Sequence, residues 1–127
     1  MTAQDALAGH RLERARAALE EAELLEAAGH WSGAINRIYY AAFYAARALL
    51  ALRKIDSSRH SGVISLFQEH FVKTGIVSPE IARALPQAFA RRQRSDYDDF
   101  TEVHADEVKA LRDQVKQLVS ACQEAIK

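Results

Sequence analysis

The sequence predicts an all-α fold, an up-and-down bundle of about five helices, from three observations. Alanine dominates the composition, and the 127-residue chain holds only five glycines and two prolines. Alanine loses no side-chain entropy in a helix, whereas glycine and proline interrupt one. Apolar residues recur at steps of three and four, which is the helical period, and no alternating strand pattern of useful length is present. Long helices joined by short connections pack as antiparallel neighbours, so a bundle follows.

The first two helices are predicted at roughly 4–28 and 32–54. Gly29 stands between them and is typical of the residue just after a helix C-terminus, where the left-handed conformation is common. The second helix is apolar on nearly every side, which predicts a central place in the bundle.

The third and fourth helices are predicted at roughly 58–74 and 79–98. Gly75 repeats the role of Gly29, and the sequence Ser78-Pro79 that follows is typical of an N-cap and a first helical position. Pro86 is expected to kink or restart the fourth helix, because proline cannot donate the hydrogen bond of a helix interior.

The fifth helix is predicted at roughly 101–126, with Thr101 as a candidate for its start. Its apolar stripe includes Val108, Val115 and Cys122, so the cysteine is expected in the core.

Composition and charge narrow the class of protein. Lys and Arg number 17 and Asp and Glu number 17, and this balance argues against a broad basic surface for nucleic acid. The single cysteine excludes an intrachain disulfide and a cysteine-based zinc site. The N-terminus lacks the basic and apolar regions of a secretory signal, and the apolar stretch from Ile38 to Leu52 is too short to cross a membrane. A single cytoplasmic domain over residues 1–127, without membrane attachment, is therefore expected.

A polar seam is predicted along one face of the second helix. Asn36, Tyr40, Tyr44 and Arg47 follow one another at steps of four, four and three, and Arg37 lies beside them. The seam could line a cleft or a subunit interface. Alternatively, the tyrosines belong to the core and Asn36 satisfies a buried backbone group.

The end of the fourth helix carries the sharpest charge pattern. Arg91, Arg92 and Arg94 precede a group of aspartates at positions 96–99. Arg92 and Asp96 are four apart, which allows an ion pair on one helix face. An arginine facing a cleft can also hold a phosphate bidentately, with Asp96 orienting it and Tyr97 stacking on a base. The alternative is a solvated helix face.

Of the five histidines, His60 is the strongest candidate for a functional role. It lies at the expected start of the third helix, where an imidazole could bind an anion or take part in acid–base chemistry. The alternative is a polar first turn. None of the histidines shows a zinc-binding spacing, so neither a metal site nor a cofactor is expected.

Four segments in order give a family resemblance. They are Ala34-Ile35-Asn36-Arg37 with Tyr39-Tyr40-Ala41-Ala42-Phe43, Ser58 with His60-Ser61-Gly62-Val63-Ile64 and Phe67, Phe71-Val72-Lys73-Thr74-Gly75, and Arg92 with Ser95-Asp96-Tyr97. Together they resemble the HEPN (higher eukaryotes and prokaryotes nucleotide-binding) domain family over roughly residues 7–122.

The resemblance implies an all-α bundle, commonly a homodimer, of the kind encoded beside a minimal nucleotidyltransferase. In many such pairs the HEPN protein is a ribonuclease toxin and the nucleotidyltransferase is its antitoxin, which in some pairs adenylylates a tyrosine of the toxin. The ribonuclease members use an arginine followed, after about four to six residues, by a histidine. The two copies of this motif meet at the dimer cleft. The nucleophile is the 2′-hydroxyl of RNA, so no metal is needed.

This chain departs from that motif, because Tyr97 stands where the histidine would follow Arg92. Tyrosine is a poorer base than imidazole at neutral pH. Three hypotheses therefore remain open. The first is a toxin that acts as a metal-independent endoribonuclease, and the second is a non-catalytic helical dimer that binds a nucleotide, RNA or a protein partner. The third is a purely structural helical bundle, against which the polar seam and the Arg/Asp cluster argue. The expected catalytic residues are Arg92, Asp96, Tyr97 and His60, and those expected to bind nucleotide or RNA are Asn36, Arg37, Tyr40 and Arg94.

Overall fold

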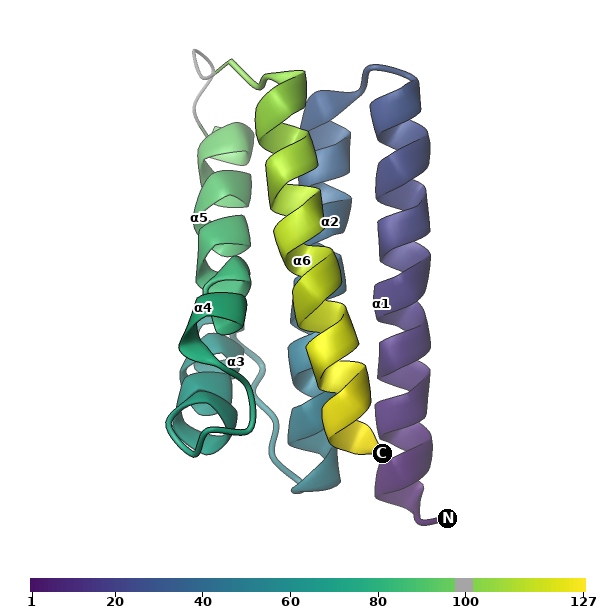
Figure 1. Ribbon diagram of the computed structural model, residues 1–127, viewed down its shortest axis with the longest axis vertical. Helices are drawn as coiled ribbons and strands as arrows, with labels where there is room; N and C mark the ends of the chain where they lie inside the picture. Colours follow the sequence, from purple (N-terminus) through teal and green to yellow (C-terminus); the bar gives the residue numbers. More distant parts are fainter. Residues whose placement is uncertain (98–101) are drawn as a thin grey trace.

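The computed structural model describes residues 1–97 and 102–127, and it is an antiparallel helical bundle. Four helices run along the long axis: α1 (Ala3–Ala27), α2 (Trp31–Leu52), α5 (Ala84–Tyr97) and α6 (Ala105–Ile126). The short helices α3 (His60–Phe67) and α4 (Pro79–Ala82) lie at the end of the bundle where α5 begins (Figure 1). No strand occurs in the described part of the chain. The predicted all-α, up-and-down bundle is confirmed.

The connection between α1 and α2 forms as the sequence predicts. Gly29 has a φ of 78°, and the His30 N–H donates to the Leu25 carbonyl at 2.8 Å, closing the end of α1. A residue with a Cβ is strained at that φ, which explains the glycine. The turn is tight, so α1 and α2 pack as antiparallel neighbours along most of their length.

The third predicted helix divides into two helical forms. After α3, the chain continues as a π-helix, Gln68–Val72, and then turns at Gly75, which has a φ of 81°. The fourth predicted helix is likewise divided, into α4 and α5, with the break at Arg83. Pro86 has no N–H to donate to the Ala82 carbonyl, and this missing bond accounts for the break between α4 and α5, as predicted.

The predicted start of the last helix is wrong by four residues. Helix α6 begins at Ala105, after His104 in an extended conformation, and not near position 101. Asp106 and Glu107 in its first turn favour this start, because acidic side chains stabilise a helix N-terminus. Thr101 itself, and the predicted end of the fourth helix at position 98, lie outside the described residues.

Helix α2 occupies the centre of the bundle and contacts α1, α3, α5 and α6. Its large buried side chains are Ile35, Ile38, Tyr39, Phe43, Leu49 and Leu50. Cys122 of α6 is fully buried against this core, as predicted. None of the described helices is long and apolar enough to cross a membrane.

Candidate functional site

The predicted polar seam of α2 forms a half-buried stripe along the helix. Asn36, Arg37, Tyr40, Tyr44 and Arg47 are all partly exposed, whereas the residues between them are buried. Helix α2 therefore packs its apolar side into the bundle and leaves this face open to solvent.

Both ends of the stripe are fixed by arginines. Arg14 of α1 donates to the Tyr44 hydroxyl at 2.9 Å and stacks on its ring. Arg37 donates to the side-chain oxygen of Asn36 at 3.2 and 3.0 Å, and its guanidinium lies 4.9 Å from the centre of the Tyr40 ring. In the described residues, the recorded hydrogen bonds of the Asn36 side chain go to Arg37 and not to a backbone group.

A pocket of about 520 Å³ opens beside this stripe, between α3 and α5. Three of the expected catalytic residues line it: His60 from the start of α3, and Arg92 and Tyr97 from α5. The other residues lining it are Arg59, Ser61, Phe89 and Gln93. The fold thus brings together an imidazole and a guanidinium that are far apart in the sequence.

Arg92 is held in the pocket by contacts on two sides. Its Nε donates to Oδ2 of Asp96 at 3.2 Å, which confirms the ion pair expected from their spacing. On the other side, its guanidinium carbon lies 5.1 Å from the centre of the Tyr39 ring and 5.4 Å from that of Tyr40. These contacts leave Arg92 partly exposed to the pocket, with a fixed orientation.

His60 lies on an aromatic surface provided by α2. Its ring stacks on Phe43 with centroids 4.6 Å apart, and its Nδ1 is 2.5 Å from the hydroxyl of Tyr39. Burial lowers the pKa of His60 below its ordinary value of 6.5, and the positive charges of Arg92 and Arg47 lower it further. The imidazole is therefore favoured in its neutral form at neutral pH.

Acidification is expected to destabilise the folded chain through His60. Because the pKa of His60 is lower in the folded than in the unfolded chain, its contribution to the free energy of unfolding is complete above about pH 6.5. It is lost as the pH falls below that value and through the lower pKa of the folded chain. Urea unfolding at about pH 7.5 and 5.5 measures this loss. We expect the loss to be larger in the wild type than in a His60→Gln variant; equal losses would contradict the prediction.

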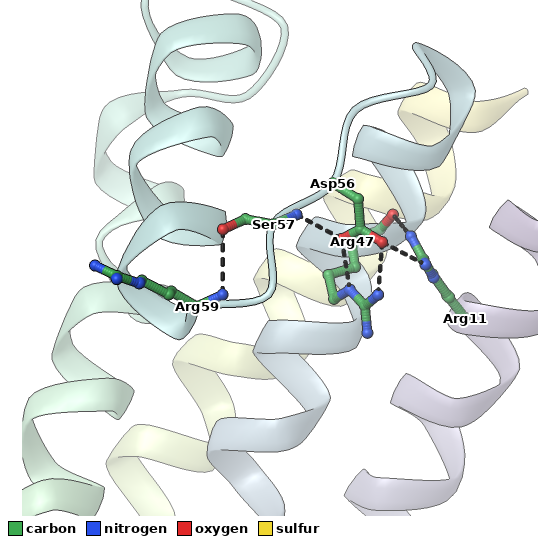
Figure 2. A network of polar contacts seen from close by, with 5 residues as sticks. All are labelled: Arg11, Arg47, Asp56, Ser57 and Arg59. Carbon is green, nitrogen blue, oxygen red and sulfur yellow. Dashed lines mark hydrogen bonds and ion pairs between the residues drawn. The ribbon is translucent and has the colours of Figure 1, made fainter.

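The segment that leads into α3 is anchored to the rest of the bundle by Asp56 (Figure 2). Its carboxylate accepts hydrogen bonds from Arg11 at 3.1 Å, from Arg47 at 2.9 and 3.3 Å, and from the Ser57 N–H at 2.8 Å. Burial acts to raise the pKa of Asp56, but the hydrogen bonds of Arg47 and Ser57 outweigh it, so that pKa is lowered. The carboxylate therefore joins α1, α2 and the start of α3.

The start of α3 also depends on a close approach between Ser57 and Gly62. The Ser57 Oγ accepts a hydrogen bond from the Arg59 N–H, as Figure 2 shows, at 3.2 Å. A Cβ at position 62 would lie 2.1 Å from that Oγ, so only glycine fits there without movement. Through this turn the local sequence fixes where His60 enters the pocket.

The three arginines of the charge cluster have different surroundings. Arg91 is 5% exposed, pairs with Glu107 of α6 and donates to the Glu102 carbonyl at 3.2 Å, so it joins α5 to α6. Arg94 is exposed and does not line the pocket, and its charge acts on the pKa of Glu107. Only Arg92 faces the pocket, and the expectation that Arg94 lies in the same site is not supported by its position.

The other expected residues are brought to the rim of the pocket. Tyr97 lines it and is 81% exposed, whereas Asp96 acts through its ion pair with Arg92. Tyr40 lies against both Arg92 and His60, and Arg37 and Asn36 continue from Tyr40 along α2. Within residues 1–97 and 102–127, no group of three or more His, Cys, Asp or Glu side chains could hold a metal ion.

The sequence analysis did not single out Tyr39 as a functional residue. Its ring is fully buried, like those of ordinary core residues, and only its hydroxyl reaches His60. The helical period places Tyr39 in the core, and nothing in the sequence indicates a contact with His60, which is 21 positions away.

Comparisons with known proteins support one family. The family model described as the HEPN domain matches residues 8–125. A "UPF0332 protein" of Thermotoga maritima is 41% identical over 96 residues, which are 76% of this chain and 73% of that protein. Two proteins of Methanocaldococcus jannaschii also match. "Putative toxin MJ0142" is 35% identical over 79% of this chain and 68% of its own length, and "Putative toxin MJ0605" is 31% identical over 76% and 74%.

Proposed function

The chain belongs to the HEPN domain family, and on this premise we propose that it is a toxin-like protein that cleaves RNA in the pocket between α3 and α5. The observation that carries the proposal is that His60 and Arg92 line the same pocket. The ribonuclease motif of the family requires an arginine and a histidine, and here the histidine comes from α3 in place of the position held by Tyr97. The names of the two relatives from Methanocaldococcus jannaschii support the toxin-like role.

The proposed reaction uses the 2′-hydroxyl of RNA as the nucleophile. It attacks the adjacent phosphorus, the bond from phosphorus to the 5′-oxygen breaks, and the products are a 2′,3′-cyclic phosphate and a 5′-hydroxyl. The proton lost by the 2′-hydroxyl is balanced by the proton gained by the 5′-oxygen. This chemistry needs no metal, because the substrate supplies its own nucleophile.

The pocket residues have distinct roles in this proposal. Arg92 binds the phosphate and stabilises the charge that develops on its oxygens. Asp96 holds the guanidinium by the observed ion pair. His60 supplies a nitrogen that can exchange protons near neutral pH, and Tyr40 and Tyr97 offer rings on which a base can stack.

The proposal includes a homodimer and a minimal nucleotidyltransferase as antitoxin. The pocket of one chain is lined by two arginines, Arg92 and Arg59, whereas phosphate recognition improves when several cations converge. A dimer that places two such pockets side by side would double the charge without a broadly basic surface. This is compatible with the net charge of zero.

The test is RNA cleavage by the purified chain in the presence of EDTA, followed by analysis of the product ends. We expect fragments with 2′,3′-cyclic phosphate and 5′-hydroxyl ends, and loss of cleavage in a His60→Gln variant. Growth of bacteria expressing the chain alone, and together with a nucleotidyltransferase encoded beside it, tests the toxin and antitoxin roles. Intact RNA and normal growth with the chain alone would exclude the proposal.

A second candidate function is a non-catalytic dimer that binds a nucleotide, RNA or the nucleotidyltransferase. The presence of Tyr97 where the family's ribonucleases carry a histidine favours it. Titration of the chain with ATP and with a short RNA separates the two functions, because this candidate predicts binding without cleavage.

A further inference from the structure

The contact between Tyr39 and His60 indicates which nitrogen of the neutral imidazole carries the proton. The Tyr39 ring is fully buried among Tyr40, Phe43, Phe89 and the His60 ring. Its hydroxyl lies 2.5 Å from Nδ1 of His60. One of the two groups must donate the proton of this hydrogen bond, and the surroundings decide which.

The phenol is the donor, because in residues 1–97 and 102–127 its hydrogen has no recorded acceptor other than His60. The neighbour on its other side is the Arg92 guanidinium, which stacks on the Tyr39 ring and has only N–H donors. Burial raises the pKa of Tyr39, and the charge of Arg92 opposes this without reversing it, so the hydroxyl keeps its proton. Within the described residues, Nδ1 of His60 is the acceptor that the hydroxyl reaches.

Because the Tyr39 hydroxyl donates to Nδ1, the imidazole must carry its own proton on the other nitrogen. A neutral imidazole has one protonated and one unprotonated nitrogen, so an Nδ1 that accepts a hydrogen bond leaves the proton on Nε2. In residues 1–97 and 102–127, Nε2 makes no recorded hydrogen bond. It is also absent from the buried polar atoms that lack a partner, so it is not buried. It is therefore free to meet a ligand in the pocket.

We propose that Tyr39 is a positioning residue that holds neutral His60 in its Nε2–H tautomer, so that His60 offers an N–H donor to a phosphate oxygen beside Arg92. This inference rests on the proposed function for the identity of the ligand, and it deepens that function by assigning the resting role of His60. A neutral imidazole can stabilise developing negative charge as a hydrogen-bond donor. The pocket then presents two donors, a guanidinium and an imidazole, to one anion.

The test is the tautomer of His60, measured by long-range proton–nitrogen NMR on protein labelled with ¹⁵N-histidine. His60 is assigned by the loss of its signals in His60→Gln. At about pH 7.5, above the ordinary histidine pKa, we expect protonated Nε2 and unprotonated Nδ1 in the wild type. The Tyr39→Phe variant, which removes only the hydroxyl, is expected to populate both tautomers.

Tyr44→Phe provides the matched control, because it removes the same atom from the same helix. The Tyr44 hydroxyl is bonded to Arg14 and not to His60, so this variant is expected to keep the Nε2–H tautomer. A wild-type proton on Nδ1, or an unchanged tautomer in Tyr39→Phe, would overturn the inference. The wild-type spectrum decides the first point even if a variant does not fold.

A second measurement connects the tautomer with ligand binding. Inorganic phosphate, added to the wild type, is expected to shift the Nε2 signal of His60. Tyr39→Phe is expected to raise the phosphate concentration that gives half of this shift about fivefold, the change that loss of one typical net hydrogen bond produces. No shift in the wild type would contradict the donor role. Neither readout requires turnover, so a failure of RNA cleavage and a failure of this assignment can be told apart.

Discussion

Replacement of Arg92 by alanine is expected to lower the rate of RNA cleavage by about 10²- to 10³-fold, as removal of one preorganised charge-stabilising donor commonly does. The guanidinium faces the pocket beside His60 and is held by Asp96 and two tyrosine rings. Arg92→Lys keeps the charge but loses the planar fork, so its rate should fall between those of wild type and alanine variant. Initial rates on a short RNA at fixed salt measure the effect.

Arg83→Ala is the control for this substitution. It removes the same charge from an exposed position between α4 and α5 that has no side-chain partner in the described part of the chain. Unfolding curves of both variants are needed, because Arg92 also packs on Tyr39 and Tyr40. Equal cleavage by Arg92→Ala and Arg83→Ala would contradict the role of Arg92.

Glu107→Ala is expected to lower the free energy of unfolding by about 3 kcal/mol, because it leaves the buried Arg91 without its ion-pair partner. Arg91 is 5% exposed and has one further recorded acceptor, the Glu102 carbonyl at 3.2 Å. An unpaired charge in such surroundings is costly, whereas the loss of a surface ion pair is not. Urea unfolding at constant pH measures the difference.

Glu124→Ala is the control on the same helix. Its carboxylate pairs only with the exposed Lys127 in the described residues, so its removal should change the free energy of unfolding by less than about 1 kcal/mol. A double variant, Arg91→Met with Glu107→Ala, should regain part of the lost stability because no buried charge remains. Equal unfolding midpoints for Glu107→Ala and Glu124→Ala would contradict this account.

The fold could be predicted from the sequence because its signals are local. The helical period is visible within each helix. The helix ends and starts are marked by two glycines with positive φ and by the Ser78-Pro79 cap, each within a few residues of the boundary it determines. The start of α6 was misplaced for the same reason. Thr101 has the chemistry of a helix start, but α6 begins at Ala105, after the extended His104, where the acidic first turn follows.

The candidate site could be predicted only where its contacts are local. The ion pair of Arg92 with Asp96 follows from a spacing of four on one helix. The sequence distinguished Arg92 from Arg91 by its spacing to Asp96, but it did not predict where Arg91 lies. Neighbouring positions on a helix point about 100° apart, so Arg91 is buried against α6 and Arg92 faces the pocket. The contact between Tyr39 and His60 depends on the packing of α3 against α2, which periodicity does not specify.

The ring and the hydroxyl of Tyr39 have different neighbours, so core packing and the candidate site select for different parts of this side chain. Its ring belongs to the hydrophobic core, and its hydroxyl contacts His60, which lines the pocket. A residue such as leucine or phenylalanine could satisfy the core alone, so selection for heat resistance without selection for activity would allow the hydroxyl to disappear. If the proposed cleavage of RNA harms the host, that substitution offers a route by which the fold survives and the proposed activity is lost.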